Sequence, residues 1–326
     1  MPKGVAFLAL NLMLFSGVSV AAGYPERPIT MIVPYAPGGS TDGLARVVAE
    51  KMGEVLKQTV VVENIGGVGG VIGIQRFLRA APDGYTVMLG NMGTFTIANT
   101  LYPKMNFQPK TQLTPIGLVA EVPQMLAVSV ASGFKDLPSL VTRMRDTSQP
   151  KLNLANGGPG GTSHIGSVYF TYVTQSQAEQ IPYKGSGPAI TDLMAGNVDI
   201  TVDQTVTIIP ASKSGRIVPL AIVGETRSPL MPEVPTFAEG GVPEFDFSVW
   251  NAIVGPQGMA PDQVKVLSDA LSVVLSHPSI QAKLDSLAAV IPNAERRGPE
   301  ELKRLIDRDV DRFAKLIQDA NITVNE

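Results

Sequence analysis

The stretch that decides the fold is IVPYAPGGSTDGLAR, residues 32–46. A short apolar run ends there at a proline, a Gly-Gly turn follows, and Ser-Thr-Asp begins a helical pattern. Backbone N–H groups at a helix N-terminus, with hydroxyl side chains beside them, are typical of a site for an anion. The same order also fits a plain turn in which Ser40 or Thr41 caps the helix. This loop by itself therefore leaves an anion site and a simple cap as two open interpretations.

A second stretch, LNLANGGPGGTSHIGS at residues 152–167, repeats this order of strand, glycine turn, hydroxyl residues and helix. Residues 161–163 (Gly-Thr-Ser) take the place that residues 39–41 (Gly-Ser-Thr) take in the first stretch, and His164 follows directly. The repetition favours the anion site, since each loop directs N–H groups and hydroxyls away from a helix start. We expect the two loops to come from different lobes and to hold one carboxylate between them.

Short apolar runs alternate with helical patterns in two consecutive series along the chain. The runs are continuous and do not alternate with polar residues, which favours parallel sheets that are covered on both faces. Two such series predict two α/β lobes, with residues 24–122 plus 225–326 in lobe one and residues 123–224 in lobe two, so that the chain crosses between them twice. The Pro/Gly-rich residues 227–245 are expected to form an ordered surface connection. Strands are predicted at 29–35, 59–64, 85–91, 114–121, 124–130, 151–156, 179–185, 198–204 and 217–225, and helices at 41–57, 70–80, 137–146, 164–174 and 188–196, with three more after residue 261.

The first 22 residues are typical of a signal peptide. Lys3 precedes a mostly apolar run, and small residues at positions 19–22 allow cleavage near Ala21 or Ala22. The run is short for a membrane span, and an N-terminal anchor helix is the alternative. We therefore expect an exported protein that is free in the periplasm.

The sequence gives little support for catalysis, a metal or a cofactor. It has no cysteine, only two histidines, and no glycine fingerprint for a nucleotide. Its formal net charge is −3 without a basic block, which argues against a nucleic-acid partner. An exported enzyme acting on a carboxylate would need a positioned acid–base pair, for which Asp42, Asp203 and His164 are the candidates. Asp42 is instead expected to pair with Arg46, four residues further along the same helix face.

Several motifs recur in order: YAPGGSTDGLAR, APDGYTVMLGNMGT, LANGGPGGTSH, PYKGSGPAITDLMAGNVDI, VDQ, RSPLMPEVPTFAEGG and VW. With them the chain resembles the Bug-type periplasmic solute-binding receptors of tripartite tricarboxylate transporters, over essentially all of its mature length. The resemblance implies a two-lobed α/β receptor that closes on a small carboxylate like a flytrap and delivers it to membrane transporter subunits. It also implies a protein that is not an enzyme, holds no cofactor or metal, and works as a monomer.

The resemblance further implies that backbone N–H groups, hydroxyls and ordered water hold the ligand, without arginine. Gly161 stands where many family members carry a hydroxyl residue. A sensor that presents its closed form to a signalling partner would have the same fold, and the sequence leaves that alternative open, together with the identity of the carboxylate. The expected ligand-binding residues are Tyr35, Pro37, Gly38, Gly39, Ser40, Thr41, Asp42, Asn91, Thr94, Gly161, Thr162, Ser163, His164 and Asp203.

Overall fold

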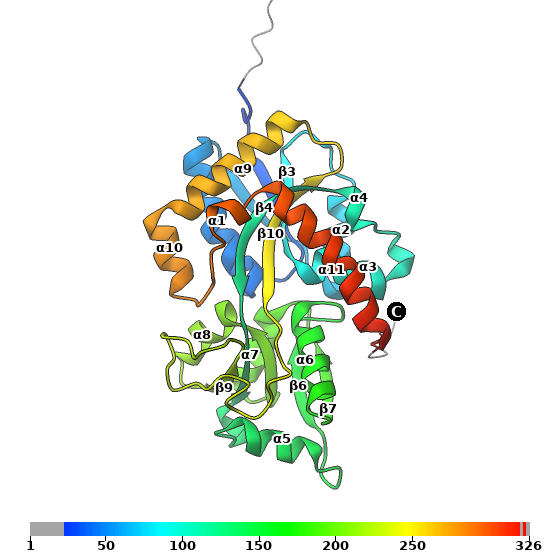
Figure 1. Cartoon of the computed structure of the whole chain (residues 1–326), viewed down its shortest axis with the longest axis vertical. Coiled ribbons are helices and arrows are strands. Elements are labelled where there is room, and N and C mark those ends of the chain that lie inside the picture. The colour runs from blue at the N-terminus through cyan, green and yellow to red at the C-terminus, as the bar shows by residue number, and fades with distance from the viewer. Residues whose placement is uncertain (1–22, 320–321, 324–326) are drawn as a thin grey trace, which may run out of the picture.

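The computed structural model describes residues 23–319, 322 and 323, so the predicted signal peptide lies outside the described residues. Two five-stranded sheets form two lobes that are stacked along the long axis of the molecule (Figure 1). The first sheet has the order β2-β1-β3-β10-β4 and the second has the order β7-β6-β8-β5-β9. The strands of the first sheet are β1 (Ile29–Val33), β2 (Val60–Asn64), β3 (Thr86–Asn91), β4 (Leu113–Val122) and β10 (Val249–Pro256). Those of the second are β5 (Gln124–Ser129), β6 (Leu152–Asn156), β7 (Ala178–Pro182), β8 (Ile200–Gln204) and β9 (Ile217–Ile222).

Both sheets are mixed, so the predicted parallel sheets are only partly correct. In the first sheet β10 runs antiparallel to β3 and β4, and in the second β5 runs antiparallel to β8 and β9. The reason lies in the two predicted crossings, which the fold confirms. The strands β5 and β10 enter their lobes from the crossings and run away from the boundary, whereas their neighbours run toward it. Periodicity along one strand carries no information about this direction.

Helices cover both faces of each sheet, as expected for two α/β lobes. The predicted helices are found within a few residues of their expected ends, but β10 and α8 were not predicted from the sequence. A π-helix, Gly93–Ile97, follows β3 directly. The α-helices are α1 (Ser40–Leu56), α2 (Val71–Phe77), α3 (Ala98–Leu101), α4 (Pro109–Gln112), α5 (Leu137–Arg145), α6 (Thr162–Val173), α7 (Ser186–Ala195), α8 (Thr205–Ser212), α9 (Pro261–Ser276), α10 (Pro278–Asp285) and α11 (Pro299–Asp319).

The core of the first lobe follows the alternation of side chains along β1. Met31 and Val33 pack on the face covered by α1 and α9, and Ile32 packs on the opposite face, which is covered by α2 and α11. Every residue of β10 is buried. Burial on both faces explains why these strands read as continuous apolar runs.

The segment of residues 227–245 packs on the second lobe. The Phe237 and Phe245 rings are buried and contact Phe170 of α6 with centroid distances of 6.1 and 5.8 Å. This packing favours assigning residues 227–245 to lobe two. The residue ranges given above for the two lobes remain a prediction. Within the described residues, no helix combines the length and the apolar character needed to cross a membrane.

Candidate functional site: a cleft between the lobes

Helix starts from both lobes meet at the boundary between them. α1 begins at Ser40 in lobe one, while α6, α7 and α8 begin at Thr162, Ser186 and Thr205 in lobe two. Each follows a strand whose carboxyl end reaches this boundary, which is where open α/β sheets place their ligand sites. Between the helix starts lies a cavity of about 20 Å³, which is room for about one or two water molecules. Its described lining consists of Tyr35, Gly39, Ser40, Thr41, Asn91, Gly157, Gly161, Thr162, Ser163, Ser186 and Gln204.

The loop between β1 and α1 turns its only acid away from the cavity. Asp42 accepts hydrogen bonds from the Gly38 N–H at 2.9 Å and from the side chains of Arg46 and Asn64 at 3.0 and 2.9 Å. The predicted pairing of Asp42 with Arg46 is thus confirmed. Burial alone would raise the pKa of Asp42, but these three hydrogen bonds lower it below its usual range. The carboxylate therefore folds the loop and is neutralised there.

Tyr35 and Asn91 form a hydrogen-bonded floor beneath the first loop. The Tyr35 hydroxyl lies 3.3 Å from Oδ1 of Asn91 and 2.8 Å from Oγ1 of Thr94, and Nδ2 of Asn91 donates to Oγ1 of Thr41 at 3.2 Å. Burial raises the pKa of Tyr35 to about 12, so its hydroxyl stays protonated. Thr94 belongs to the π-helix, a type of helix that often marks functional sites.

The loop between β6 and α6 is held by its own side chains. The hydroxyl of Ser163 accepts from the Gly157 N–H at 2.6 Å, and Nδ1 of His164 accepts from the Gly160 N–H at 3.2 Å. Burial lowers the pKa of His164 to about 4, so its ring is neutral near pH 7. His164 accordingly supports the loop and supplies no positive charge to a ligand.

The cavity is lined with hydrogen-bond donors. The oxygens of Thr41 and Ser163 already accept hydrogen bonds from the protein, so their hydroxyl protons are left to point at a ligand. The starts of α1, α6 and α7 add free backbone N–H groups and the positive end of the helix dipole. None of the described lining residues is Lys, Arg or His. An acceptor-rich, negatively charged group is the chemistry that such a lining complements.

The lobes touch one another around this cavity. The Ser40 and Thr207 hydroxyls share a hydrogen bond across the boundary. The Ala36 N–H donates to the carbonyl of Lys184 at 3.2 Å, and the Tyr102 hydroxyl donates to the carbonyl of Pro159 at 2.8 Å. The described arrangement is therefore a closed one, in which both loops face the same cavity.

Among the predicted residues, Tyr35, Gly39, Ser40, Thr41, Asn91, Gly161, Thr162 and Ser163 come together around the cavity. Six others, Pro37, Gly38, Asp42, Thr94, His164 and Asp203, do not contribute to its lining, and their contact with a ligand stays a prediction.

Three lining residues, Gly157, Ser186 and Gln204, were not predicted. The signal for Ser186 was present, because it follows a glycine at a helix start, as Ser40 and Thr162 do. Behind it, Asp203 accepts from the Gln204 N–H at 2.7 Å and from the Ser186 hydroxyl, and burial raises the pKa of Asp203 to about 6. This acid is thus a buried support for the start of α7.

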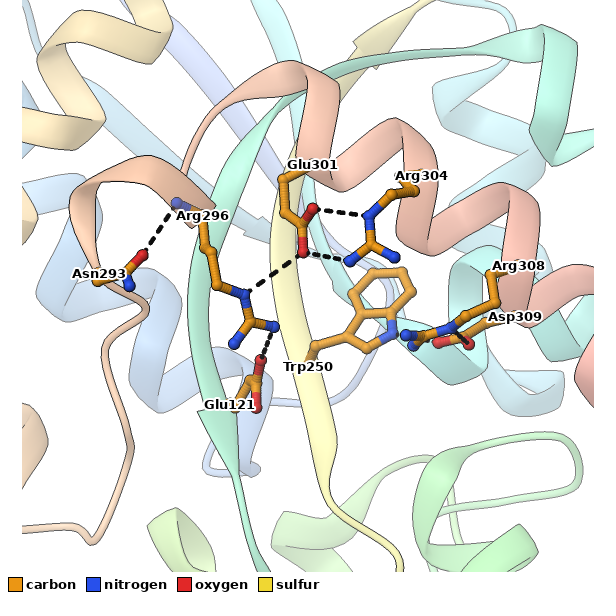
Figure 2. A network of polar contacts seen from close by, with 8 residues as sticks. All are labelled: Glu121, Trp250, Asn293, Arg296, Glu301, Arg304, Arg308 and Asp309. Atoms are coloured by element: carbon orange, nitrogen blue, oxygen red, sulfur yellow. Dashed lines mark hydrogen bonds and ion pairs between the residues drawn. The ribbon is translucent and has the colours of Figure 1, made fainter.

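A larger cavity of about 240 Å³ lies beside the crossing strands β4 and β10 and the helix α11. Figure 2 shows some of its charged lining residues in a polar network that also includes Glu301 and Arg304 of α11. Arg296 joins Glu121 to Glu301, and the buried Asp309 accepts from Nε of Arg308 and from Nε1 of Trp250, both at 2.7 Å. These contacts fix β4 and β10 to α11, so we interpret this region as the framework of the crossings.

Comparisons with known proteins agree with this geometry. The family described as "Tripartite tricarboxylate transporter family receptor" matches residues 44–322. Protein BugT of Bordetella pertussis is 33% identical over 298 residues, which cover 91% of this chain and 90% of BugT.

Solved structures give the same result for the fold. The periplasmic binding protein BugD is similar with a TM-score of 0.86 at 35% identity, covering 92% of this chain and 99% of BugD. The structure of MatC from Rhodopseudomonas palustris with bound malate has a TM-score of 0.86 at 32% identity, covering 90% of this chain and 100% of MatC.

Proposed function

The chain belongs to the tripartite tricarboxylate transporter receptor family, and on that premise we propose that it captures a small organic carboxylate between its lobes and delivers it to a membrane transporter. Membership of this family makes it a solute-binding receptor with the two-lobed fold of periplasmic binding proteins. That the bound solute is a small carboxylate, and that the receptor delivers it to a tripartite transporter, are our proposals.

The hydrogen-bond donors that line the cavity are the main observation in support of a carboxylate ligand. Thr41 and Ser163 have their oxygens occupied by protein N–H groups, which leaves their protons for an acceptor. Two helix dipoles point at the cavity, α1 from one lobe and α6 from the other. A carboxylate offers acceptors and a negative charge together, whereas a neutral acceptor would satisfy the donors without complementing the helix dipoles. That MatC was solved with malate supports the same class of ligand.

The contacts of the candidate catalytic residues support binding without catalysis. The Asp42 carboxylate is occupied by Arg46, Asn64 and the loop backbone, and His164 is held neutral by burial. Neither group contributes to the described lining of the cavity. A general acid–base pair must reach the reacting atoms, and these two candidates are engaged elsewhere.

We further propose that the receptor acts in the periplasm as a monomer after removal of residues 1–22, with cleavage near Ala21 or Ala22. Similarity to BugD, a periplasmic binding protein, supports this location. Mass spectrometry of periplasmic protein should find a mature N-terminus at Ala22 or Gly23. An intact Met1 in that fraction would contradict it.

A thermal-shift screen of organic acids tests the proposed function. A ligand that binds only the folded state raises the melting temperature by mass action, by an amount that grows with its concentration. We expect at least one aliphatic carboxylate to do so, and its neutral amide to fail. Equal shifts by an acid and its amide would refute a carboxylate site.

A further inference from the structure

The cavity beside α11 differs in character from the cleft between the lobes. Its volume of about 240 Å³ is close to the lower end, about 300 Å³, of pockets that hold small organic molecules. A large part of its lining is apolar and buried, from Met92, Phe247, Trp250, Leu305 and Phe313. This lining can receive a hydrocarbon chain or an aromatic ring.

Most charged side chains around this cavity already have partners, as Figure 2 shows. Arg296 pairs with Glu121 of β4 at 3.2 Å. The buried Asp309 has both oxygens occupied, by Nε of Arg308 and by Nε1 of Trp250. These contacts neutralise the charges involved, so they build the walls of the cavity and leave little for a ligand.

Arg312 and Asp246 are the two exceptions. Both line the cavity, Arg312 from α11 and Asp246 from the chain that leads into β10. In the part of the chain that the structure describes, neither side chain forms a hydrogen bond or an ion pair with another residue. Unpaired charges are ordinary on a protein surface, but these two lie on the same apolar cavity. It therefore presents one unmatched positive charge and one unmatched negative charge beside an apolar surface.

We propose that this cavity is a second ligand site, separate from the cleft, which takes a small zwitterion with an apolar chain, such as a free amino acid. Arg312 binds the carboxylate, Asp246 binds the ammonium group, and the apolar lining receives the chain. An anion alone would leave Asp246 unmatched, and a cation alone would leave Arg312 unmatched. The inference does not depend on the proposed function, because neither residue lines the cleft.

Trp250 is a built-in reporter for this site. It is the single tryptophan of the chain, it lines the cavity beside α11, and it does not contribute to the described lining of the cleft. Its fluorescence should therefore respond to an occupant of this cavity. The titration uses full-length mature protein, both without an added acid and with the cleft saturated by the acid found in the screen. Calorimetry on the same samples provides a second readout.

The probes are leucine and two analogues that each lack one of its charges. Isocaproate lacks the ammonium group, and isoamylamine lacks the carboxylate. Leucine should bind at least about threefold more tightly than either analogue, because each of them leaves one charge of the site unmatched. Alanine should bind more weakly than leucine, because it loses most of the contact with the apolar lining.

Two variants test the assignment of the charges. Arg312→Gln should weaken the binding of leucine and of isocaproate by about threefold or more, but not that of isoamylamine. Asp246→Asn should weaken leucine and isoamylamine and should improve isocaproate, which no longer meets a like charge. The matched controls are Arg76→Gln and Asp285→Asn, which remove the same charges at exposed positions outside this lining, and they should leave all affinities unchanged.

A general loss of stability cannot produce opposite responses to the two analogues, and both substituted residues are exposed, so the variants should fold. No fluorescence change and no heat with leucine or alanine up to about 10 mM would overturn this inference. Leucine binding that is the same in Arg312→Gln, Asp246→Asn and wild type would also overturn it. Either result leaves the proposed function standing, because that function is tested by acids that enter the cleft.

Discussion

Gly187→Ala tests whether the closed arrangement is the one that binds. Gly187 lies in the first turn of α7 in lobe two, and an added Cβ would meet the carbonyl oxygen of Pro37 in lobe one at 2.3 Å. Ordinary contacts begin at 3.4 Å, so the lobes would have to separate by about 1.1 Å. Within lobe two the change is favourable, because alanine stabilises a helix by up to about 1 kcal/mol relative to glycine.

The substitution should therefore weaken binding without weakening the fold. Forcing a methyl group into a packed contact costs about 1–3 kcal/mol, and here that cost falls on the closed form alone. The apparent dissociation constant rises as the binding-competent fraction falls. We expect an affinity loss of about 5- to 150-fold, with a free energy of unfolding equal to or slightly above that of wild type.

The assay is calorimetric titration with the acid found in the screen, together with small-angle scattering with and without that acid. Gly298→Ala is the matched control, because a Cβ there has no neighbour within 4 Å. A second pair of variants, Gly69→Ala and Gly133→Ala, separates the effect of a contact between lobes from the effect of backbone strain. Both glycines have left-handed φ values, 61° and 79°, so both substitutions strain the backbone. Only the Cβ added at Gly69 would meet the Pro159 carbonyl oxygen, at 1.6 Å.

Two results would refute this reasoning. Gly187→Ala could bind within about twofold of wild type, which would mean that the ligand-bound form is more open than the described one. Alternatively, Gly133→Ala could lose as much affinity as Gly69→Ala, which would assign the effect to strain instead of the contact between lobes.

Three further predictions concern single side chains. Ser40→Ala should reduce affinity about three- to tenfold in titration, since it removes one hydrogen bond and leaves the α1 N–H groups; complete loss of binding would contradict a backbone anchor. Burial raises the pKa of Asp203 from 3.8 to about 6, so its contribution to stability is lost as the pH rises through that range, by about 3 kcal/mol in all. Asp203→Asn should therefore raise the melting temperature relative to wild type more at about pH 8 than at about pH 4, and an equal difference at both would refute the assignment. Trp250→Phe should lower the free energy of unfolding by about 1.5–3 kcal/mol in denaturant titration, because the buried Asp309 loses its 2.7 Å donor; an unchanged midpoint would show that the bond adds nothing.

Local signals predicted the two glycine loops that line the cavity, because each signal lies within a few residues of its helix start. Gly39 and Gly161 precede α1 and α6 directly, and the hydroxyl residues after them begin the helices as expected. The predicted tail helices likewise begin at Pro261, Pro278 and Pro299, where proline suits the first turn.

The elements that the sequence did not reveal depend on distant parts of the chain. β10 is an apolar run interrupted by Asn251, and its direction follows from the second crossing. α8 contains Pro210, which argues locally against a helix. Gln204 lines the cavity, and its side chain is held by a hydrogen bond from Asn251, 47 residues away, so no window of sequence around Gln204 contains the cause.

The division of the donors between lobes bears on how a receptor can release what it holds. A single arginine would carry a full charge on one lobe and keep a carboxylate bound after opening. Here each helix start contributes only part of a charge, with α1 on lobe one and α6 and α7 on lobe two. In the proposed site, opening would therefore remove part of the binding contacts at once, whichever lobe retains the ligand. Because affinity then depends on closure, a partner that stabilises the open form would discharge the ligand without competing for the site.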